Sequence, residues 1–207
     1  TTLTYNANFG ENPAEKTHAL KDGTTNLLNN TRVTLYDATQ ADFTRDGYEL
    51  IGWNTNQAAA NKGTVEYAYG AEVIVDTDIT AGANILYAVW EQSTTTVTVK
   101  KVVEGAMGDR TKAFEFEYKL GETGDWTPVQ EGGLKHSEKA DISNVPLNST
   151  LYIREKAEAN YTVTAGSSVH DKSITVTDDT EHGYKIITVQ NVANAETITV
   201  TNSNTLT

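Results

Sequence analysis

Val97-Thr98-Val99-Lys100-Lys101-Val102-Val103 is the stretch that decides how the second half of the chain folds. Side chains alternate between the two faces of an extended strand, so Val97, Val99, Lys101 and Val103 share one face. Three β-branched apolar residues predict that this face points into a core. Lys101 then points into the same core, where an ammonium group is strongly destabilising unless it is paired, neutralised or chemically consumed.

Two later strands pose the same problem. In residues 151–155 alternation places Glu155 on the apolar face, and in residues 198–202 it places Asn202 there. An amine, a carboxyl and a carboxamide therefore interrupt or end three apolar rows. Alternation alone does not separate Asn202 from Asn204, which lies two positions further along the chain.

Composition and charge narrow the class of protein. The 207 residues are rich in threonine, valine, tyrosine and glycine, which favours β structure, and they include no cysteine, which excludes disulfides and thiolate chemistry. The net charge of −12 repels nucleic acid and anionic lipid, so we exclude both as main partners. No apolar run approaches the roughly 18 residues that a membrane span needs.

Residues 93–207 predict an all-β, immunoglobulin-like sandwich, because alternating segments recur at intervals near ten residues. In the segment 114–118 the pattern turns Phe114, Phe116 and Tyr118 inward. The polar stretch 91–96 is the expected joint between domains. The other expected strands are 134–142, 151–155, 161–164, 173–177, 184–190 and 197–202.

Residues 1–92 predict a second, smaller and mainly β domain. A helical turn capped by Asp37 or Thr39 is expected over 37–43, while 11–31 suits a loop or one short helical turn and 54–63 a loop. The expected strands are 3–9, 33–36, 48–53, 65–67, 72–75 and 85–90.

The first half resembles the Listeria–Bacteroides repeat, the B-repeat of internalin-type surface proteins. The resemblance is carried by Tyr5-Asn6-Ala7-Asn8, by Gly47-Tyr48-Glu49-Leu50-Ile51-Gly52-Trp53-Asn54-Thr55 and by Leu86-Tyr87-Ala88-Val89-Trp90. It implies a β-grasp (ubiquitin-like) fold that serves as a tandem spacer. The chain departs from the family at Asn8-Phe9-Gly10, where a glycine pair usually follows asparagine, and in its longer 10–46 segment.

The second half resembles the streptococcal pilin isopeptide-linkage family, relatives of Cna B-type domains. The resemblance is carried, in order, by 99–105, 114–116, 151–155 with Tyr161, and 198–202. The family forms a spontaneous amide between a first-strand lysine and a last-strand asparagine, aided by a buried acid. By resemblance, these roles come to Lys101, Asn202 and Glu155.

The chemistry of such a bond needs these residue types. Attack on a carboxamide requires a neutral amine, and burial lowers the pKa of a lysine. Burial raises the pKa of a carboxylic acid, so Glu155 is expected to stay protonated, polarise the Asn202 carbonyl and carry a proton to the departing ammonia. In the alternative, the Lys101 stem snorkels until its ammonium reaches solvent, or it forms an ordinary salt bridge with Glu155.

Other residues that suggest chemistry have simpler interpretations. Trp53 and Trp90 would suit a ligand platform, but alternation favours the core. The stretch Asp76-Thr77-Asp78 lacks the other oxygen ligands of a calcium loop and is expected to be a solvated turn. The histidines show no metal-ligand spacing and no nucleophile elbow is present, so we expect surface histidines and no enzyme: His18, His136, His170 and His182.

We therefore expect a fragment of a Gram-positive-type cell-surface protein, an adhesin or pilin stalk. It would act as a structural spacer, extracellular and at the cell surface or cell wall, with signal and anchor outside this sequence and neighbouring modules as partners. No cofactor, metal or membrane contact is expected. The alternative is a ligand-binding adhesin module that recognises a host glycan or protein, for which Trp126 and the Asp178-Asp179 turn are the candidates.

Overall fold

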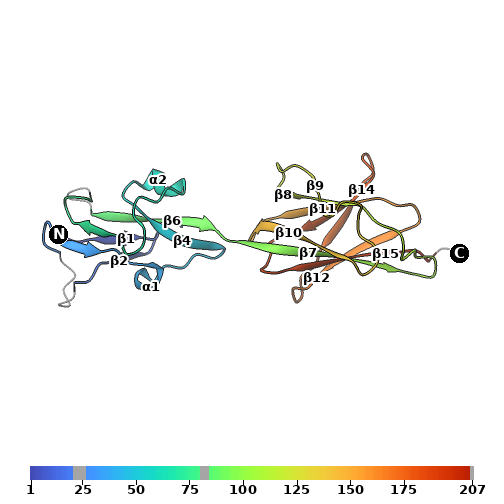
Figure 1. Ribbon diagram of the computed structural model, residues 1–207, viewed down its shortest axis with the longest axis horizontal. Helices are drawn as coiled ribbons and strands as arrows, with labels where there is room; N and C mark the ends of the chain where they lie inside the picture. Colours follow the sequence, from blue (N-terminus) through green and yellow to red (C-terminus); the bar gives the residue numbers. More distant parts are fainter. Residues whose placement is uncertain (21–26, 80–83, 206–207) are drawn as a thin grey trace. The chain divides into compact units, whose positions relative to one another are not determined.

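The computed structural model describes residues 1–20, 27–79 and 84–205. The chain is mainly β and divides into two compact units, Thr1–Ser93 and Thr94–Thr207, which are described separately below (Figure 1). The sixth strand ends at Gln92 and the seventh begins at Thr94. No helix among the described residues is long and apolar enough to cross a membrane.

The first unit is built on a four-stranded sheet with the order β2-β1-β6-β4. The first and last strands of the unit, β1 and β6, are parallel neighbours at its centre, and each has an antiparallel strand on its outer side. A separate pair, β3 with β5, is antiparallel. The strands are β1 (Thr4–Asn6), β2 (Glu15–Thr17), β3 (Arg32–Thr34), β4 (Tyr48–Asn54), β5 (Glu72–Ile74) and β6 (Ile85–Gln92).

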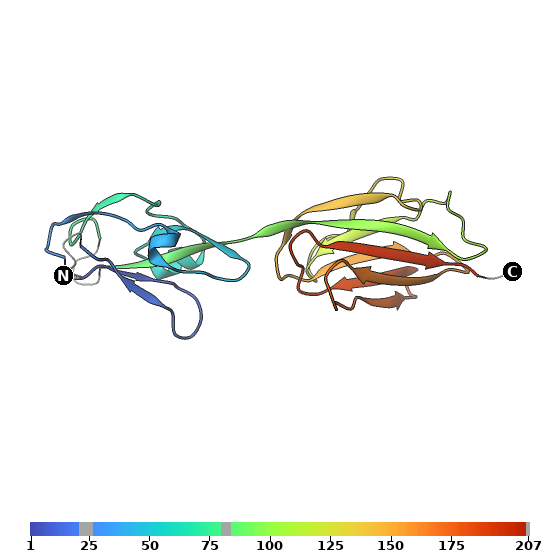
Figure 2. The ribbon, with the colours of Figure 1, turned by 90° about the horizontal axis from the view of Figure 1, so that it is seen from below.

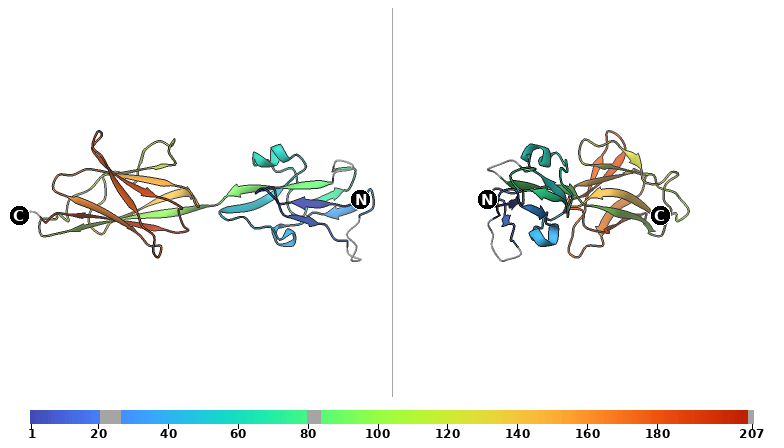
Figure 3. Two further views of the ribbon diagram at one scale, coloured as in Figure 1. Left: turned by 180° about the vertical axis from the view of Figure 1, so that it is seen from behind. Right: turned by 60° about the vertical axis from the view of Figure 1, so that its left-hand side comes forward.

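Two short helices lie on opposite sides of β4 and β6 (Figures 1 and 3). The helix α1 (Ala38–Ala41) begins at Asp37, whose carboxylate accepts from the Gln40 N–H in a capping box, so the helical turn predicted there is confirmed. The helix α2 (Gln57–Asn61) contradicts the loop predicted over 54–63. The Asn56 side chain caps α2 at the Ala59 N–H, and this local bond offsets the weak periodicity of the segment.

Two strand predictions for the first unit are wrong. Residues 65–67 form only an isolated bridge from Tyr67 to Trp53, while β2 lies inside the segment predicted to be a loop or one short helical turn. Part of that segment, residues 21–26, falls outside the described residues. β2 is three polar residues long, and it is held by its ladder to β1 rather than by an apolar face, so alternation could not reveal it.

The core of the first unit contains a cluster of aromatic rings among aliphatic side chains. Tyr5 and Trp53 are fully buried, and the Trp53 indole N–H donates to the carbonyl of Tyr36 at 2.8 Å, which confirms Trp53 as a core residue. Tyr36 stacks on Tyr5 with ring centroids 4.8 Å apart. Trp90 packs against this core but is only half-buried, so its assignment to the core is wrong in part, because it also lines a surface pocket.

The second unit consists of two sheets packed face to face. One sheet has the order β10-β7-β15-β12 and the other β13-β14-β11-β8-β9 (Figures 1 and 3). Apolar residues from both fill the space between them, which confirms a β-sandwich. The strands are β7 (Thr94–Glu104), β8 (Phe116–Leu120), β9 (Thr127–Pro128), β10 (Lys139–Pro146), β11 (Leu151–Lys156), β12 (Thr162–Ser167), β13 (Thr175–Asp179), β14 (Tyr184–Val189) and β15 (Thr197–Ser203).

The first and last strands of the second unit, β7 and β15, are parallel neighbours (Figure 2). Their register pairs Lys101 with Val200 and Val103 with Asn202. Residues two apart on adjacent strands are diagonal neighbours on one face of a sheet, close enough for a long side chain to span. The register therefore brings the Lys101 amine to the Asn202 carboxamide.

Candidate functional site

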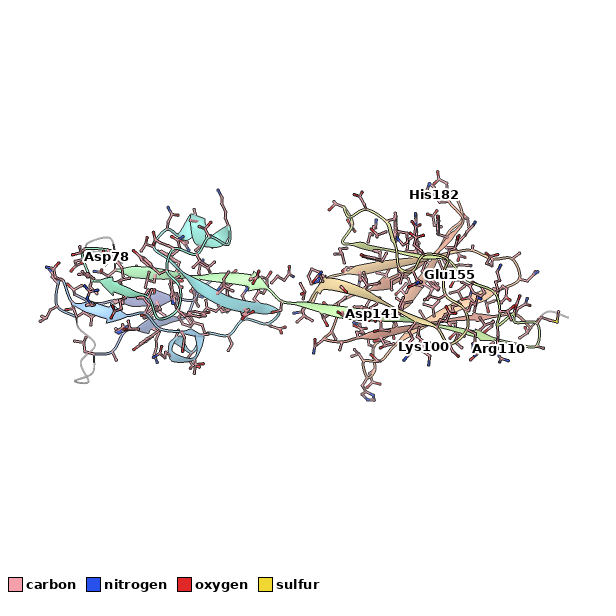
Figure 4. All side chains as sticks on the ribbon, viewed as in Figure 1. Asp78, Lys100, Arg110, Asp141, Glu155 and His182 are labelled. Carbon is pink, nitrogen blue, oxygen red and sulfur yellow. The ribbon has the colours of Figure 1, made fainter. Side chains whose placement is uncertain are left out.

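Three polar side chains meet in the core of the sandwich. Lys101 on β7 and Asn202 on β15 come from one sheet, and Glu155 on β11 comes from the other. All three residues have 0% of their surface exposed, whereas Asn204 is partly exposed. Figure 4 labels Glu155 among the strands of this unit. The structure thus brings together the three residues singled out in the sequence, and burial separates Asn202 from Asn204.

Hydrogen bonds join the three side chains in a closed triangle. The Lys101 Nζ donates to Glu155 Oε2 at 3.0 Å and also to the Asn202 carbonyl oxygen. The Asn202 amide nitrogen donates to Glu155 Oε1. Glu155 thus bridges the lysine nitrogen and the amide nitrogen, and it does not contact the carbonyl oxygen that it was expected to polarise.

Aromatic rings enclose the amine. Nζ of Lys101 lies 4.3 Å from the centroid of Phe114 and 5.6 Å from that of Phe116. Tyr161 packs edge-on against Phe114, with centroids 5.3 Å apart, and its hydroxyl accepts from the Asp109 N–H at 3.0 Å. The inward orientation predicted for Phe114 and Phe116 is confirmed, while Tyr118 is only half-buried. Because the rings exclude water, electrostatic interactions inside the cluster are strengthened.

Burial moves the pKa values of the two titratable groups toward neutrality. Desolvation lowers the pKa of Lys101 to about 8, although the neighbouring Glu155 carboxyl opposes the shift. Desolvation raises the pKa of Glu155, against the opposing effects of Lys101 and of the hydrogen bond from Asn202. Both directions favour a neutral amine beside a neutral acid, which is the protonation state that amide formation requires.

The snorkelling alternative for Lys101 is excluded, because its ammonium does not reach solvent. The salt-bridge alternative agrees with the structure, because Lys101 Nζ lies 3.0 Å from Glu155 Oε2. The neighbouring Lys100 is partly exposed on the other face of β7 and lines a surface hollow with Asp141. Alternation predicts that Lys101 faces the core and Lys100 the opposite side of the strand, and the two side chains differ in burial as expected.

The two carboxylates of the predicted solvated turn, Asp76 and Asp78, both accept hydrogen bonds within the chain. Asp78 accepts from the Ile74 N–H at 2.7 Å, and Asp76 accepts from the Asn84 amide at 2.7 Å, so both are engaged in turn contacts. Among the described residues no group of three or more His, Cys, Asp and Glu side chains is arranged to hold a metal.

The surface assignment of the histidines is wrong for His18. The residue is 7% exposed, because its ring stacks on Tyr36 at 4.3 Å and its Nδ1 is hydrogen-bonded to the Tyr5 hydroxyl at 2.8 Å. The exposed His182 lies at the tip of the β13–β14 hairpin (Figure 4), and His170 is also exposed. His136 is partly buried and accepts from the Val103 N–H.

The two features considered for ligand binding in the second unit are already engaged within the chain. Trp126 is half-buried and stacks on the Arg154 guanidinium, whose carbon lies 4.2 Å from the ring centroid. Asp178 and Asp179 end the strand β13 rather than forming a turn. Asp178 is ion-paired with Lys185 at 2.6 Å, and Asp179 contacts His182 at 2.9 Å.

A second buried lysine–glutamate pair was not found from the sequence. Glu196, which is 1% exposed, accepts from Lys172 Nζ at 2.8 Å, from the Ser167 hydroxyl and from the Ala193 N–H at 3.0 Å. Glu196 directly precedes β15 and has the same parity as Ile198, Val200 and Asn202, so the signal for the acid was present. Lys172 lies in a loop, where no periodicity marks it.

No family model matches the chain, and no curated protein matches it. Similar solved structures include a pilus-presented adhesin, Spy0125 (Cpa), at 18% identity and a TM-score of 0.41, with 67% of this chain and 35% of that chain covered. A bacterial adhesin from Mobiluncus mulieris that contains intramolecular disulfide, isopeptide and ester bond cross-links is 17% identical with a TM-score of 0.40, and 69% of this chain and 54% of that chain are covered.

A mutant of the major pilin from Streptococcus pyogenes is 18% identical with a TM-score of 0.44, over 96% of this chain and 84% of that chain. The chain spans about a third to a half of the length of the two adhesins. The similar solved structures are thus pilins and adhesins, and the function proposed below rests on the geometry of the site.

Proposed function

We propose that the second unit cross-links itself through an amide between Lys101 Nζ and Asn202 Cγ. The observation that carries the proposal is the closed triangle of three fully buried side chains, in which the amine contacts the carboxamide and the acid bridges both nitrogens. Fixed proximity of this kind replaces a bimolecular encounter and can lower the barrier by roughly 7–11 kcal/mol.

The reaction balances without a cofactor. The neutral Lys101 amine attacks the Asn202 carbonyl carbon, a proton passes from Nζ through the Glu155 carboxyl to the amide nitrogen, and ammonia leaves. One N–C bond forms, one breaks, and Glu155 ends in the protonation state in which it began. Each chain reacts once, so the proposal describes self-maturation of a structural module and no enzyme acting on a substrate.

The position of the bond supports a mechanical role. β7 begins at Thr94 and β15 ends at Ser203, and the two strands are parallel neighbours. Tension entering at Thr94 would pass along β7 to Lys101, cross the amide, and leave along the end of β15. The residues between 101 and 202 would carry little of the load, which is the property that a stalk module needs without any cysteine.

The first unit supports the same assignment more generally. Its sheet places the first and last strands as a parallel central pair with one antiparallel strand on each side, which is the strand order of a β-grasp fold. We propose that it is a Listeria–Bacteroides-type spacer, joined to a Cna B-like module in an extracellular stalk protein of a Gram-positive-type cell wall. Its partners in this role are neighbouring modules of the same protein.

Intact mass spectrometry of the purified chain tests the cross-link. We expect the measured mass to be lower than the sequence mass by one ammonia, and Lys101→Met, Asn202→Ala and Glu155→Ala each to restore the mass of their unreacted sequence. Lys100→Met and Asn204→Ala are matched controls, because both positions lie outside the triangle, and they should keep the loss of ammonia. A full unreacted mass in folded, aged wild-type protein would overturn the proposal.

A further inference from the structure

A pocket of about 360 Å³ opens on the surface of the first unit. Four segments supply its lining: the residues after β1, the turn before β4, the end of α2 and the strand β6. This volume lies at the lower end of the range for small-molecule sites. The lining residues used below are Asn8, Phe9, Arg45, Tyr48, Asn61 and Trp90.

A tight turn places the Arg45 guanidinium over aromatic rings. The Tyr48 N–H donates to the Arg45 carbonyl at 3.1 Å, and Gly47 supplies the positive φ of 76° that the turn requires. The guanidinium carbon lies 3.7 Å from the Tyr48 centroid, 5.3 Å from that of Phe9 and 5.9 Å from that of Trp90. Such stacking holds the planar group in one orientation.

The Trp90 and Phe9 rings are themselves fixed. The Trp90 indole N–H donates to the Ala7 carbonyl at 2.7 Å, and Phe9 packs edge-on against Trp90 with centroids 5.4 Å apart. Trp90 is nevertheless only half-buried, so part of its ring faces solvent at the pocket. The wall is therefore rigid and aromatic, with the cation held in place on it.

The second unit contains the same arrangement with one additional partner. The Arg154 guanidinium carbon lies 4.2 Å from the Trp126 centroid and 3.9 Å from that of Tyr184, and two of its N–H groups donate to the Glu117 carboxylate at 2.9 and 2.8 Å. The Arg45 guanidinium, in contrast, forms neither an ion pair nor a hydrogen bond with any described residue. A carboxylate is the group that the Arg45 arrangement lacks.

Amides form the other wall. Asn8 Nδ2 donates to Asn61 Oδ1 at 2.8 Å and to the Ala88 carbonyl at 3.0 Å, while Asn8 Oδ1 accepts from the Gln57 amide at 3.1 Å. This bracing leaves the Asn61 amide nitrogen without a hydrogen-bond partner among the described residues. Amide groups both donate and accept, as hydroxyl groups do, so this wall suits a ligand that carries hydroxyls.

We propose that this pocket binds a sugar acid: a pyranose ring whose carboxylate pairs with the Arg45 guanidinium, whose hydroxyls contact Asn61, and whose apolar face packs on Trp90. The net charge of −12 disfavours anions in general, so an acidic ligand is selected here by local geometry and not by the overall field of the protein. The site lies in a different unit from the cross-link and does not depend on it.

This site is tested by titrating small ligands into the full 207-residue chain and recording the NMR shifts of its backbone amides. The probes are methyl β-D-glucuronide, the neutral methyl β-D-glucoside and acetate. We expect the glucuronide to shift the amides of Arg45, Asn61 and Trp90, and to bind about tenfold or more tightly than either other probe, because a charge-assisted bidentate bond and the ring contacts add. Lys101→Met should bind like the wild type.

Arg45→Met keeps an apolar stem over the rings but removes the guanidinium, and it should abolish the preference for the glucuronide over the glucoside. Arg32→Met is the matched control, because Arg32 lies in the same unit, is exposed and pairs with Glu72 instead. Asn61→Ala, at an exposed position, should weaken binding of the glucuronide and leave binding of acetate unchanged. The proposal is overturned if the glucuronide causes no amide shift at the pocket of the wild type, or if the glucuronide and the glucoside bind equally well. If acetate and the glucuronide bind equally well, the sugar part of the proposal is overturned.

Discussion

The two units solve the same problem, stabilisation without cysteine, in different ways. In the first unit the buried aromatic network is uncharged: the Tyr5 hydroxyl is hydrogen-bonded to His18 Nδ1 and accepts from the Tyr36 N–H. In the second, an amine and an acid are buried beside a carboxamide. The first arrangement needs no reaction to remove a charge, whereas the second would become more stable through the proposed cross-link, since the product would no longer contain the buried amine.

The second unit contains another lysine–glutamate pair, Lys172 with Glu196, which differs from the Lys101 cluster in its protonation and burial. Desolvation raises the pKa of Glu196, but the Ala193 N–H, Lys172 and Ser167 outweigh it, so that the pKa is lowered and the acid stays ionised. The Lys172 side chain remains 16% exposed and keeps its charge partly hydrated. Complete burial of the amine and a carboxamide within reach distinguish the Lys101 cluster.

The largest effect is expected from Lys101→Met. Losing a bond that closes nearly the whole unit should lower the free energy of unfolding of the second unit by ~4–5 kcal/mol, through the larger entropy of its unfolded chain. Urea denaturation checks this, with fluorescence of Trp126 reporting on the second unit in a Trp53→Phe, Trp90→Phe background. Lys100→Met should leave the transition in place. An unmoved transition in Lys101→Met, with the bond shown absent by mass, would contradict the mechanical role.

Trp53→Ala should produce a comparable loss in the other unit. Removing a fully buried indole that also donates to Tyr36 should lower the free energy of unfolding of the first unit by about 3–5 kcal/mol. The second unit should keep its Trp126 transition and its loss of one ammonia. If both transitions shift together, the units do not unfold separately and the comparison between them fails.

The sequence predicts what depends on alternation and misses what depends on isolated contacts. Lys101, Glu155 and Asn202 were identified because each interrupts or ends an apolar row, and burial of such a row dictates which face points inward. The same rule failed to separate Asn202 from Asn204, because both positions have the same parity. Burial and the end of β15 at Ser203 distinguish them in the structure.

Elements without periodicity could not be found in this way. The strand β2 is polar throughout and exists because it pairs with β1, and α2 depends on the single cap from Asn56. Besides the nearby Tyr48, Arg45 contacts Phe9 and Trp90, which lie far from it in sequence. Such contacts are set by the tertiary fold, and local pattern carries no information about them.

A smaller effect is expected from Glu196→Gln, which removes the charged partner of Lys172. We expect a loss of about 2 kcal/mol in the second unit at neutral pH, because three hydrogen bonds to the carboxylate are weakened. Since the folded pKa of Glu196 is lowered, its contribution is present above the unfolded pKa and is lost as the pH falls through the folded pKa.

Urea unfolding of the cross-linked protein between pH 7 and pH 3 checks this contribution. The difference between wild type and Glu196→Gln should narrow toward pH 3, while the mass of both proteins still shows the loss of one ammonia. A difference that stays constant with pH would mean that the pair contributes by packing rather than by charge.

The smallest effect concerns His18 in the first unit. Burial lowers the pKa of His18 below 6.5, so the folded unit binds fewer protons than the unfolded chain and loses stability as the pH falls below the unfolded value. Protonation would also place a charge in the hydrogen-bonded pair of His18 and Tyr5, at a cost on the order of 1 kcal/mol.

His18→Gln should therefore flatten the dependence of the first unit's unfolding free energy on pH between 7 and 5, since a glutamine oxygen accepts from Tyr5 but does not titrate. His170→Gln is the matched control, because His170 is exposed in the second unit and pairs only with the exposed Asp171. Urea titrations monitored through Trp53 and Trp90 separate the two results. An equally steep loss of stability in His18→Gln would mean that the carboxylates of the first unit cause its acid sensitivity. The uncharged Tyr5–His18 network would then differ from the Lys101–Glu155–Asn202 triangle in its chemistry but not in its response to pH.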